Sequence, residues 1–167
     1  TYFMQPGNYV VKLTDATGNT DVVNVTVFSS PVADFKADNV KICAGNAVSF
    51  INTSNGNSPL VNYVWAFGDG KTMDGKNLAN TSHLYKVAGQ YDVSLLVTDV
   101  NGCTSSKTAY AFIDAKENPV SDFKPSVTGS CSETQNISFA NQSTGAGFKL
   151  SYSWNFGDKQ TSTEVNP

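Results

Sequence analysis

Part of this chain is repeated further along it, and the repeat limits the folds that the sequence can adopt. Residues 31–35 read Pro-Val-Ala-Asp-Phe and return as Pro-Val-Ser-Asp-Phe at residues 119–123. The run Tyr-Val-Trp-Ala-Phe-Gly-Asp-Gly at residues 63–70 returns as Tyr-Ser-Trp-Asn-Phe-Gly-Asp-Lys at residues 152–159. The two spacings are 88 and 89 residues. Self-similarity at a fixed period is typical of structural modules arranged in series.

The repeat divides the chain into three predicted segments. Residues 2–18 resemble residues 85–102, with the tyrosines and glycines in the same order. We therefore expect the C-terminal part of one repeat at residues 1–29 (the N-terminal segment), a complete repeat at residues 30–115 (the middle segment), and the N-terminal part of a third repeat at residues 116–167 (the C-terminal segment). Both boundaries lie in short polar stretches that lead into a proline, as domain linkers often do.

The hydrophobic period in the middle segment is two, which indicates half-buried β-strands. Val48 and Phe50 alternate with Ser49 and Ile51, and residues 91–98 alternate in the same way. Asn-Gly and Asp-Gly pairs separate such runs. About seven short strands with a tryptophan in the third predict an all-β fold, an immunoglobulin-like β-sandwich. We expect strands near residues 32–37, 46–53, 62–67, 71–74, 78–84, 90–98 and 104–113, and a core of Phe35, Val48, Phe50, Trp65, Phe67, Tyr85, Tyr91, Val93, Leu95 and Val97.

Charge and composition argue against several classes of function. The net charge is −3 and all eleven basic residues are lysines, so the chain has no arginine to recognise phosphates or base edges. We expect no nucleic-acid partner. No apolar run approaches the length of about 18 residues that a membrane span needs, so we expect no direct membrane insertion. Because the chain has one histidine and three cysteines, we also expect no enzyme and no cofactor.

The middle segment contains an ordered set of motifs that resembles the PKD (polycystic kidney disease) domain. These motifs are Trp-Ala-Phe-Gly-Asp-Gly at residues 65–70, His-Leu-Tyr at residues 83–85 and Gly-Gln-Tyr-Asp-Val-Ser-Leu at residues 89–95. The tandem arrangement is also similar to the PKD arrays of large secreted surface proteins of Bacteroidota, including gliding adhesins. The residues of the structural motif are Trp65, Phe67, Gly68, Asp69, Gly70, His83, Tyr85, Gly89 and Tyr91.

Two positions depart from the pattern of the middle segment. Asn19 stands where the middle segment has Cys103, which removes a disulfide partner from the N-terminal segment. Lys159 stands where the middle segment has Gly70, which puts an identical turn in doubt.

The resemblance implies an extracellular, normally non-catalytic module. We expect a stalk or spacer of a large cell-surface or secreted protein, an adhesin, that presents a distal domain. Its partners are then neighbouring PKD repeats of the same chain, and cell-surface proteins or polysaccharide. The alternative is an accessory module of a secreted hydrolase that binds the substrate of that enzyme, either polysaccharide or protein.

The cysteines fit an oxidising compartment. Cys43 is expected between the first two strands and Cys103 just after the turn at Gly102, whereas the corresponding partner of Cys131 would lie beyond Pro167. We expect a Cys43–Cys103 disulfide and an unpaired Cys131. The alternative is that all three cysteines are reduced and buried. The chain has no C-x-x-C spacing, and a lone histidine does not complete a zinc site.

Four aspartates are candidates for a calcium site. Asp34, Asp69, Asp74 and Asp99 are all expected near strand ends or turns, where carboxylates and backbone carbonyls can surround Ca²⁺. Their spacing matches no EF-hand, however. Aspartate side chains also hydrogen-bond to the backbone of ordinary turns, and this is the alternative interpretation.

One histidine and three aromatic residues complete the candidate sites. His83 lacks a recognisable nucleophile motif in the sequence, so we expect a structural role for it, together with Tyr85, beside the tryptophan strand. Tyr63, Tyr110 and Phe112 are candidates for a sugar-stacking platform because the face on which they lie is not set by the pattern. The alternative is that these three side chains fill the core or a seam between modules.

Overall fold

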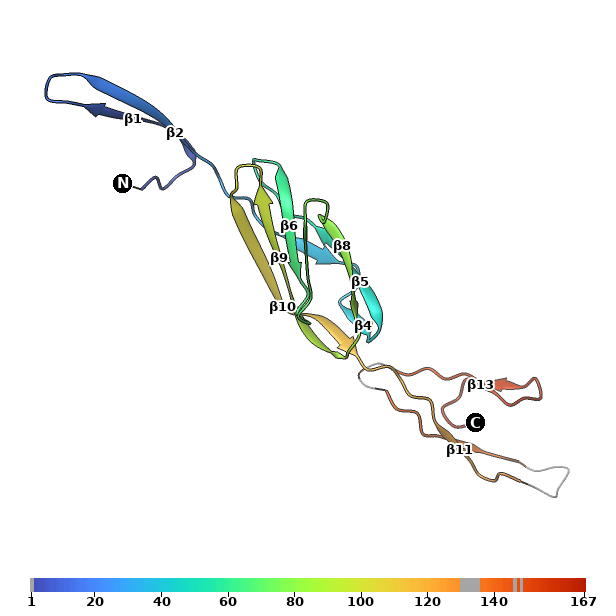
Figure 1. Cartoon of the computed structure of the whole chain (residues 1–167). Coiled ribbons are helices and arrows are strands. Elements are labelled where there is room, and N and C mark those ends of the chain that lie inside the picture. Colours follow the sequence, from blue (N-terminus) through green and yellow to red (C-terminus); the bar gives the residue numbers. More distant parts are fainter. Residues whose placement is uncertain (1, 130–135, 146, 148) are drawn as a thin grey trace.

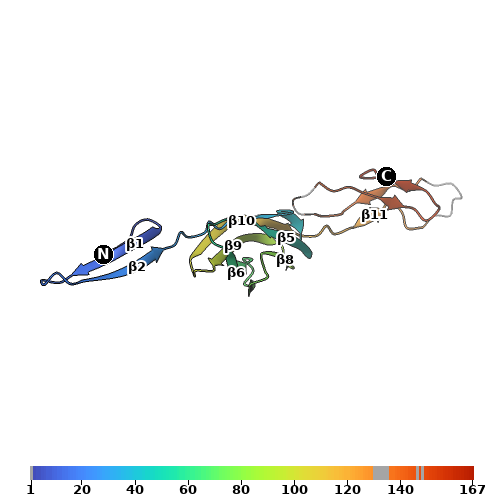
Figure 2. The same cartoon turned by 90° about the horizontal axis from the view of Figure 1, so that it is seen from above.

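The computed structural model describes residues 2–129, 136–145, 147 and 149–167, and all regular secondary structure within them is β. Three parts follow one another along a line: a hairpin, a two-sheet sandwich and a more open group of short strands (Figure 1). A view from above keeps the same order, so the elongated shape does not depend on the direction of view (Figure 2). The described residues include no helix that is long and apolar enough to cross a membrane.

The middle segment forms a sandwich of a five-stranded and a three-stranded sheet. The five-stranded sheet has the order β4-β10-β9-β6-β7, and the three-stranded sheet has the order β3-β5-β8. Neighbouring strands are antiparallel except β4, which runs parallel to the end of β10. The prediction of an all-β, immunoglobulin-like sandwich is confirmed. The bounds are β3 (Phe35–Ala37), β4 (Lys41–Cys43), β5 (Asn46–Asn52), β6 (Leu60–Ala66), β7 (Thr72–Gly75), β8 (Asn80–Tyr85), β9 (Gly89–Asp99) and β10 (Thr104–Lys116).

The core lies between the two sheets and follows the alternation of the sequence. In β9, Val93, Leu95 and Val97 are fully buried while the residues between them face outward. The aromatic ring of Trp65 is also fully buried, and its indole Nε1 donates to the Leu78 carbonyl at 2.8 Å. Of the ten expected core residues, nine are buried and Tyr91 is packed against the core while partly exposed. Each buried side chain of this size stabilises the fold by about 1.5–3 kcal/mol.

The N-terminal segment is a single antiparallel hairpin of β1 (Gly7–Thr14) and β2 (Thr20–Val27). Its turn is held by Asp15, whose carboxylate accepts from the backbone N–H groups of Thr17 at 2.8 Å and Asn19 at 2.9 Å. The turn between β9 and β10 is built in the same way around Asp99. The hairpin therefore repeats the local hydrogen bonds of β9 and β10 outside the sandwich.

In its described residues, the C-terminal segment has two strand pairs, which belong to separate sheets. β11 (Phe123–Pro125) pairs with β12 (Phe139–Asn141), and β13 (Trp154–Asn155) pairs with β14 (Thr161–Ser162). Lys159 follows β13 with φ of 77°, close to the 82° of Gly70. Despite the lysine, the two turns thus share a left-handed conformation at this position.

A side-chain hydrogen bond crosses each of the two junctions between the segments. Asn57 Nδ2 donates to Ser29 Oγ at 3.1 Å, and Asn118 Nδ2 donates to the Ala44 carbonyl at 3.0 Å. β10 ends at Lys116, so the last strand of the sandwich runs directly into the second linker. The segment boundaries at residues 29–30 and 115–116 stay a prediction.

Candidate functional site

The Trp-Ala-Phe-Gly-Asp-Gly motif forms the end of β6 and the turn that follows it. Trp65 and Phe67 point into the core and are fully buried. Gly68 has φ of 85°, and a Cβ atom at this position would lie 2.5 Å from the Asp92 carbonyl oxygen. Only glycine fits here because the neighbour is backbone that cannot move aside. Gly70, with φ of 82°, completes the turn.

Asp69 and His83 join this turn to β8. His83 Nε2 lies 2.8 Å from Asp69 Oδ2, and the imidazole stacks on the Phe67 ring with 4.1 Å between centroids and 1° between planes. Burial alone would raise the pKa of the Asp69 carboxyl, but the His83 and Lys71 N–H hydrogen bonds outweigh it and leave the pKa below its usual value. The pair therefore joins the turn to the neighbouring strand, and the role of His83 stays a prediction.

The two tyrosines of the motif bind backbone carbonyls at the same end of the sandwich. The Tyr85 hydroxyl donates to the Phe67 carbonyl at 3.1 Å, and burial raises the pKa of this phenol well above its usual value. The Tyr91 hydroxyl donates to the Val87 carbonyl at 2.7 Å, and the Tyr91 ring lies against Gly89. Both hydroxyls are engaged with the protein, so these residues build a corner of the fold.

The structure does not bring the four aspartates together. Asp34 pairs with Lys107, Asp74 accepts from Asn62 Nδ2 at 2.8 Å, and Asp99 is buried beneath its own turn. Within the described residues, no group of three His, Cys, Asp or Glu side chains is placed to hold a metal ion. Calcium needs six to eight oxygens around it, whereas these carboxylates each accept protein hydrogen bonds.

The expected Cys43–Cys103 disulfide is wrong. Both residues are free thiols. Cys43 pairs with Lys116 at the last residue of β10, while Cys103 directly precedes the first residue of that strand. A strand of 13 residues spans roughly 40 Å, whereas a disulfide requires Cα atoms within about 7 Å of each other. The parallel β4–β10 pair causes this separation. Cys131 lies outside the described residues.

The three candidate stacking aromatics have three different environments. Tyr63 is buried in the core, and Phe112 packs against the core, with its ring 5.4 Å from that of Phe35. Only Tyr110 of the three is open to solvent, with 79% of its surface exposed. The structure thus does not form a platform from all three residues.

A β-bulge explains why Tyr110 and Phe112 differ. The β9–β10 register shifts between Ala109 and Ile113. Ala111 takes the left-handed conformation with φ of 47°, and its N–H donates to Asp92 Oδ1 at 2.7 Å. Bulges next to functional sites often redirect a side chain. Here the bulge leaves Tyr110 outside while Phe112 turns in, which the alternation of the sequence could not predict.

The outward residues of β6, β9 and β10 form a surface that the sequence analysis did not identify as one site. In this sheet the register places them side by side, opposite the buried residues of the same strands. Asp92 on β9 and Asp114 and Lys116 on β10 also alternate with buried residues, whereas the rest of this surface is uncharged. Tyr110 and Leu96 are its large exposed apolar side chains. We call this surface the outer sheet face; it consists of Val64, Ala66, Ser94, Leu96, Thr98, Ser106, Thr108 and Tyr110.

Comparisons with known proteins bear mainly on the middle segment. A family model described as PKD domain matches residues 28–113. The chain is 32% identical over 124 residues to "Collagenase ColA" of Clostridium perfringens. The aligned residues cover 71% of this chain and 11% of that protein. It is 35% identical over 79 residues to "Microbial collagenase" of Vibrio alginolyticus, and here the aligned residues cover 46% of this chain and 9% of that protein. The chain thus spans about a tenth of the length of these curated relatives.

Solved structures include two isolated modules that this chain resembles. One is the PKD1 domain of Vibrio anguillarum Epp, with 34% identity and a TM-score of 0.45, covering 53% of this chain and 99% of that one. The other is the PKD1 domain of the Vibrio cholerae metalloprotease PrtV, with 32% identity and a TM-score of 0.44, covering 52% of this chain and 100% of that one.

Proposed function

Since this chain belongs to the PKD domain family, we propose that it is a non-catalytic accessory segment of a secreted, extracellular hydrolase that contacts the substrate of that enzyme. The likeness to collagenase ColA carries this proposal, because it extends over 71% of the chain and so beyond the middle segment alone. Both curated relatives are collagenases. A large protein fibre is therefore the first substrate to test.

The chemistry around the single histidine supports a non-catalytic role. His83 Nε2 is held by Asp69, and one face of its ring is covered by Phe67. A general base must instead reach the proton of a reacting group. The imidazole is engaged in holding the Gly68–Gly70 turn, so its contacts stabilise structure.

The outer sheet face is the surface that we propose contacts the substrate. Its side chains carry hydroxyl groups and short apolar groups, and Tyr110 stands out from it on the bulge. Tyrosine offers a large, amphipathic ring at low conformational cost, and such residues dominate the energetics of many interfaces. These hydroxyl groups and the exposed tyrosine ring suit hydrogen bonding to, and stacking on, a polypeptide fibre or a polysaccharide.

Cosedimentation of the whole chain with insoluble collagen fibrils tests this proposal, with an insoluble polysaccharide as the second arm. We expect saturable binding to collagen, and we expect Tyr110→Ala to weaken it by about tenfold. Ile51→Ala is the matched control, because Ile51 is an exposed apolar residue on β5 in the other sheet. Binding that Tyr110→Ala leaves unchanged contradicts the assigned surface. Binding to neither matrix contradicts the substrate-contacting role.

A second candidate function is the spacer of a cell-surface adhesin. The serial arrangement of the three parts favours it, because modules joined end to end form a semi-rigid rod (Figure 1). One side-chain hydrogen bond spans each junction, from Asn57 to Ser29 and from Asn118 to the Ala44 carbonyl. Small-angle X-ray scattering tests this candidate: a rod gives an extended distance distribution, and Asn118→Ala broadens it. A chain that is rod-like but binds neither matrix favours the spacer over the substrate-contacting role.

A further inference from the structure

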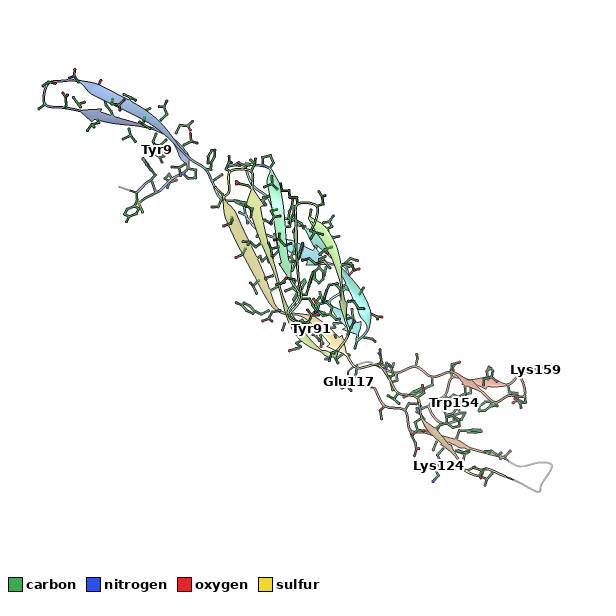
Figure 3. The ribbon with its side chains drawn as sticks, viewed as in Figure 1. Tyr9, Tyr91, Glu117, Lys124, Trp154 and Lys159 are labelled. Carbon is green, nitrogen blue, oxygen red and sulfur yellow. The ribbon has the colours of Figure 1, made fainter. Side chains whose placement is uncertain are left out.

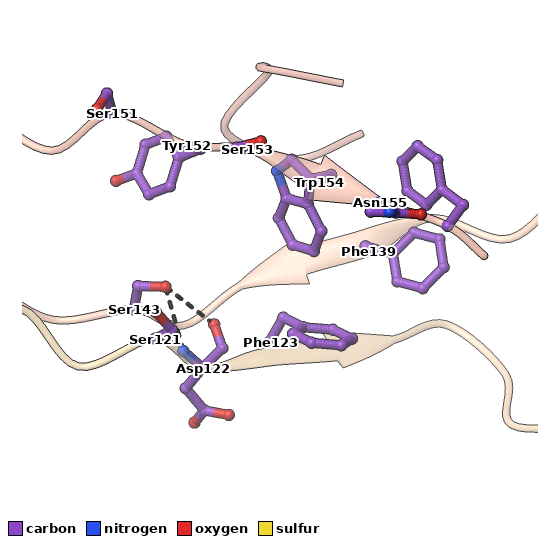
Figure 4. Close-up of a pocket in the computed structure, with 11 residues that line it drawn as sticks. Ser121, Asp122, Phe123, Phe139, Ser143, Ser151, Tyr152, Ser153, Trp154 and Asn155 are labelled. Carbon is purple, nitrogen blue, oxygen red and sulfur yellow. Dashed lines mark hydrogen bonds between the residues drawn. The ribbon is translucent and has the colours of Figure 1, made fainter. Parts of the chain in front are cut away.

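Two surface grooves of this chain differ in the kind of residue that lines them. In the C-terminal segment, the rings of Phe123, Phe139 and Trp154 line a groove of about 510 Å³ (Figure 4). The matching rings of the middle segment are buried in its core, so these are core residues by type. The other groove lies in the middle segment, and its lining is a mixture of charged residues and residues of two edge strands.

The groove of the middle segment runs between β7 and β8. We call it the edge groove; it has a volume of about 470 Å³ and is lined by Lys71 and Met73 on the β7 side and by Ser82, Leu84 and Lys86 on the β8 side. β7 is the last strand of the five-stranded sheet, and β8 is the last strand of the three-stranded sheet. The described residues therefore leave one edge of each strand without a neighbouring strand.

The open edge of β8 presents backbone groups to this groove. The Asn52 N–H donates to the Ala79 carbonyl at 3.2 Å, next to the first register pair of β5 and β8. Because antiparallel partners alternate between bonded and non-bonded pairs, every second residue from Ala79 to Tyr85 directs its backbone groups to β5. Ser82 and Leu84 lie between these positions, so their N–H and C=O groups face the open edge. Such a row of groups is a template for a further strand.

Two lysines give the edge groove its charge. Lys71 precedes β7 and Lys86 follows β8, and both side chains are exposed. The lysines that form ion pairs among the described residues are other ones. Asp69, the carboxylate in the lining, is bound to His83. The groove therefore attracts an acidic ligand, although the chain as a whole has a net charge of −3.

Apolar side chains complete the lining of the edge groove. Met73, Leu84 and Val87 are all exposed. Along β8, the groove lies beyond the Thr81 hydroxyl, which donates to Met73 Sδ at 3.1 Å. Tyr91 lies at the other end, which Figure 3 shows as the end of the sandwich nearest the C-terminal segment. An extended peptide with alternating side chains can place apolar groups against this lining and acidic groups near the lysines.

We propose that the edge groove binds an extended, acidic peptide segment, which adds a strand beside β8 to the three-stranded sheet. Its backbone pairs with the N–H and C=O groups of Ser82 and Leu84, and its carboxylates face Lys71 and Lys86. In this mode of recognition, backbone hydrogen bonds provide affinity and the side chains provide specificity. The outer sheet face belongs to the five-stranded sheet, so this second binding surface does not depend on the proposed contact with the substrate.

Amide NMR titration of the whole chain with a soluble peptide that alternates glutamate and valine tests the proposal. The glutamates repel one another and so oppose pairing of the peptide with itself. We expect saturable shifts at the amides of residues 82–84 and none at residues 94–96 of β9. A peptide of equal length that alternates lysine and valine should bind at least about tenfold more weakly. Equal affinity for the two peptides, or shifts that leave residues 82–84 unchanged, overturns the proposal.

Reversing the charge of the groove tests the role of the lysines. Lys71→Glu combined with Lys86→Glu should weaken binding of the glutamate peptide by at least about tenfold. Lys36→Glu combined with Lys41→Glu is the matched control, because these lysines are exposed on β3 and β4 and change the net charge equally. It should bind within about twofold of the native chain. Equal weakening in both double variants contradicts the assigned groove.

A proline at the open edge tests the strand pairing. Proline has no N–H group, and the Ser82 N–H faces away from β5. Ser82→Pro therefore removes no hydrogen bond of the sheet, and edge strands tolerate proline at such positions. We expect the variant to unfold cooperatively in a thermal scan and to bind the glutamate peptide at least about tenfold more weakly. A folded variant that binds like the native chain overturns the pairing with β8. If the proline unfolds β8, the charge-reversed variants still decide the proposal.

Discussion

Trp65 and Trp154 occupy matching places in the middle and C-terminal segments, yet only one of them is buried. Both indoles donate to a backbone carbonyl at 2.8 Å. Phe35 and Phe123 pack edge-on against the respective tryptophans, at 5.4 Å and 5.3 Å between centroids. Trp65 is nevertheless fully buried, while Trp154 is only half-buried. The local geometry is therefore set by nearby residues, whereas burial depends on β9 and β10.

This difference separates two contributions to stability. Turns, ring contacts and side-chain hydrogen bonds form within a short stretch of chain and recur in both segments. The hydrophobic contribution grows with the apolar area removed from water, and this area is complete only where two sheets meet. Equivalent substitutions in the two segments should therefore change the free energy of unfolding by different amounts. The difference measures how much the second sheet contributes to stability.

Replacing the tryptophans should give the largest difference. Trp65→Ala removes a fully buried ring and leaves a cavity, so we expect a loss of about 3–5 kcal/mol in the free energy of unfolding. Trp154→Ala removes a ring that still faces solvent, and we expect about 1 kcal/mol in its own segment. Hydrogen exchange resolved by segment measures both, through the amides of β5 and β12. Equal losses would show that the C-terminal segment buries its rings in solution.

The next largest difference in stability is expected for the two turn glycines. Their backbone conformations agree, but the atoms around them differ. Gly68 and Gly157 have φ values of 85° and 86°. Alanine in this conformation costs about 1–2 kcal/mol at either site. Gly68→Ala should add a further cost of about 1–3 kcal/mol, because its Cβ meets the Asp92 backbone. Chemical denaturation, monitored by hydrogen exchange in each segment, measures the loss of unfolding free energy in the two variants. A loss for Gly157→Ala as large as that for Gly68→Ala would contradict the open space at Gly157.

A smaller difference should separate the two turn aspartates. Asp69 binds His83 and caps the Lys71 N–H at 3.1 Å, whereas Asp158 caps the Gln160 N–H at 2.9 Å. We expect Asp69→Ala to cost about 1–2 kcal/mol, since a charged partner is lost from a partly buried hydrogen bond. Asp158→Ala should cost less, because it loses the backbone cap alone. Chemical denaturation of the two variants, followed by hydrogen exchange in each segment, measures the difference.

A double-mutant cycle isolates the histidine contact. Combining Asp69→Ala with His83→Ala should give a coupling energy of about 0.5–1 kcal/mol in thermal or chemical unfolding. His83→Ala on its own also loses the stacking on Phe67, so the cycle is needed to separate the two contacts. Additive effects of the two substitutions would mean that the pair does not fix the turn.

The sequence was sufficient to predict those features that depend on local pattern. Period-two alternation identified β5 and β9 and the core residues that they carry, because one face of each strand is buried. It failed for β4, whose three residues are too few to show a period. It also failed for Tyr110, because a bulge shifts the register and only the three-dimensional pairing reveals the shift.

Features that depend on distance in space were beyond the sequence. Cys43 and Cys103 are both near strand ends, and the sequence alone did not show that these are opposite ends of the sandwich. The parallel placement of β4 beside the end of β10 separates them. For the same reason, the sequence did not show that the four candidate aspartates have separate partners, because these partners depend on how the strands pair. Site prediction here fails where topology, not residue type, sets the geometry.

The smallest expected effect concerns the acid sensitivity of the N-terminal hairpin. The hydroxyl of Thr17 and the N–H groups of Asn19 and Thr17 lower the pKa of Asp15 to about 2. A depressed pKa means that the charged carboxylate stabilises the folded turn fully above pH 3.8, the unfolded value, and that this stabilisation disappears as the pH falls through about 2. NMR titration of the Gly18 and Asn19 amides follows the turn directly. Thr17→Val should move the midpoint upward while leaving β9 and β10 unaffected. A native midpoint close to the unfolded value would show that these hydrogen bonds to Asp15 do not persist in solution.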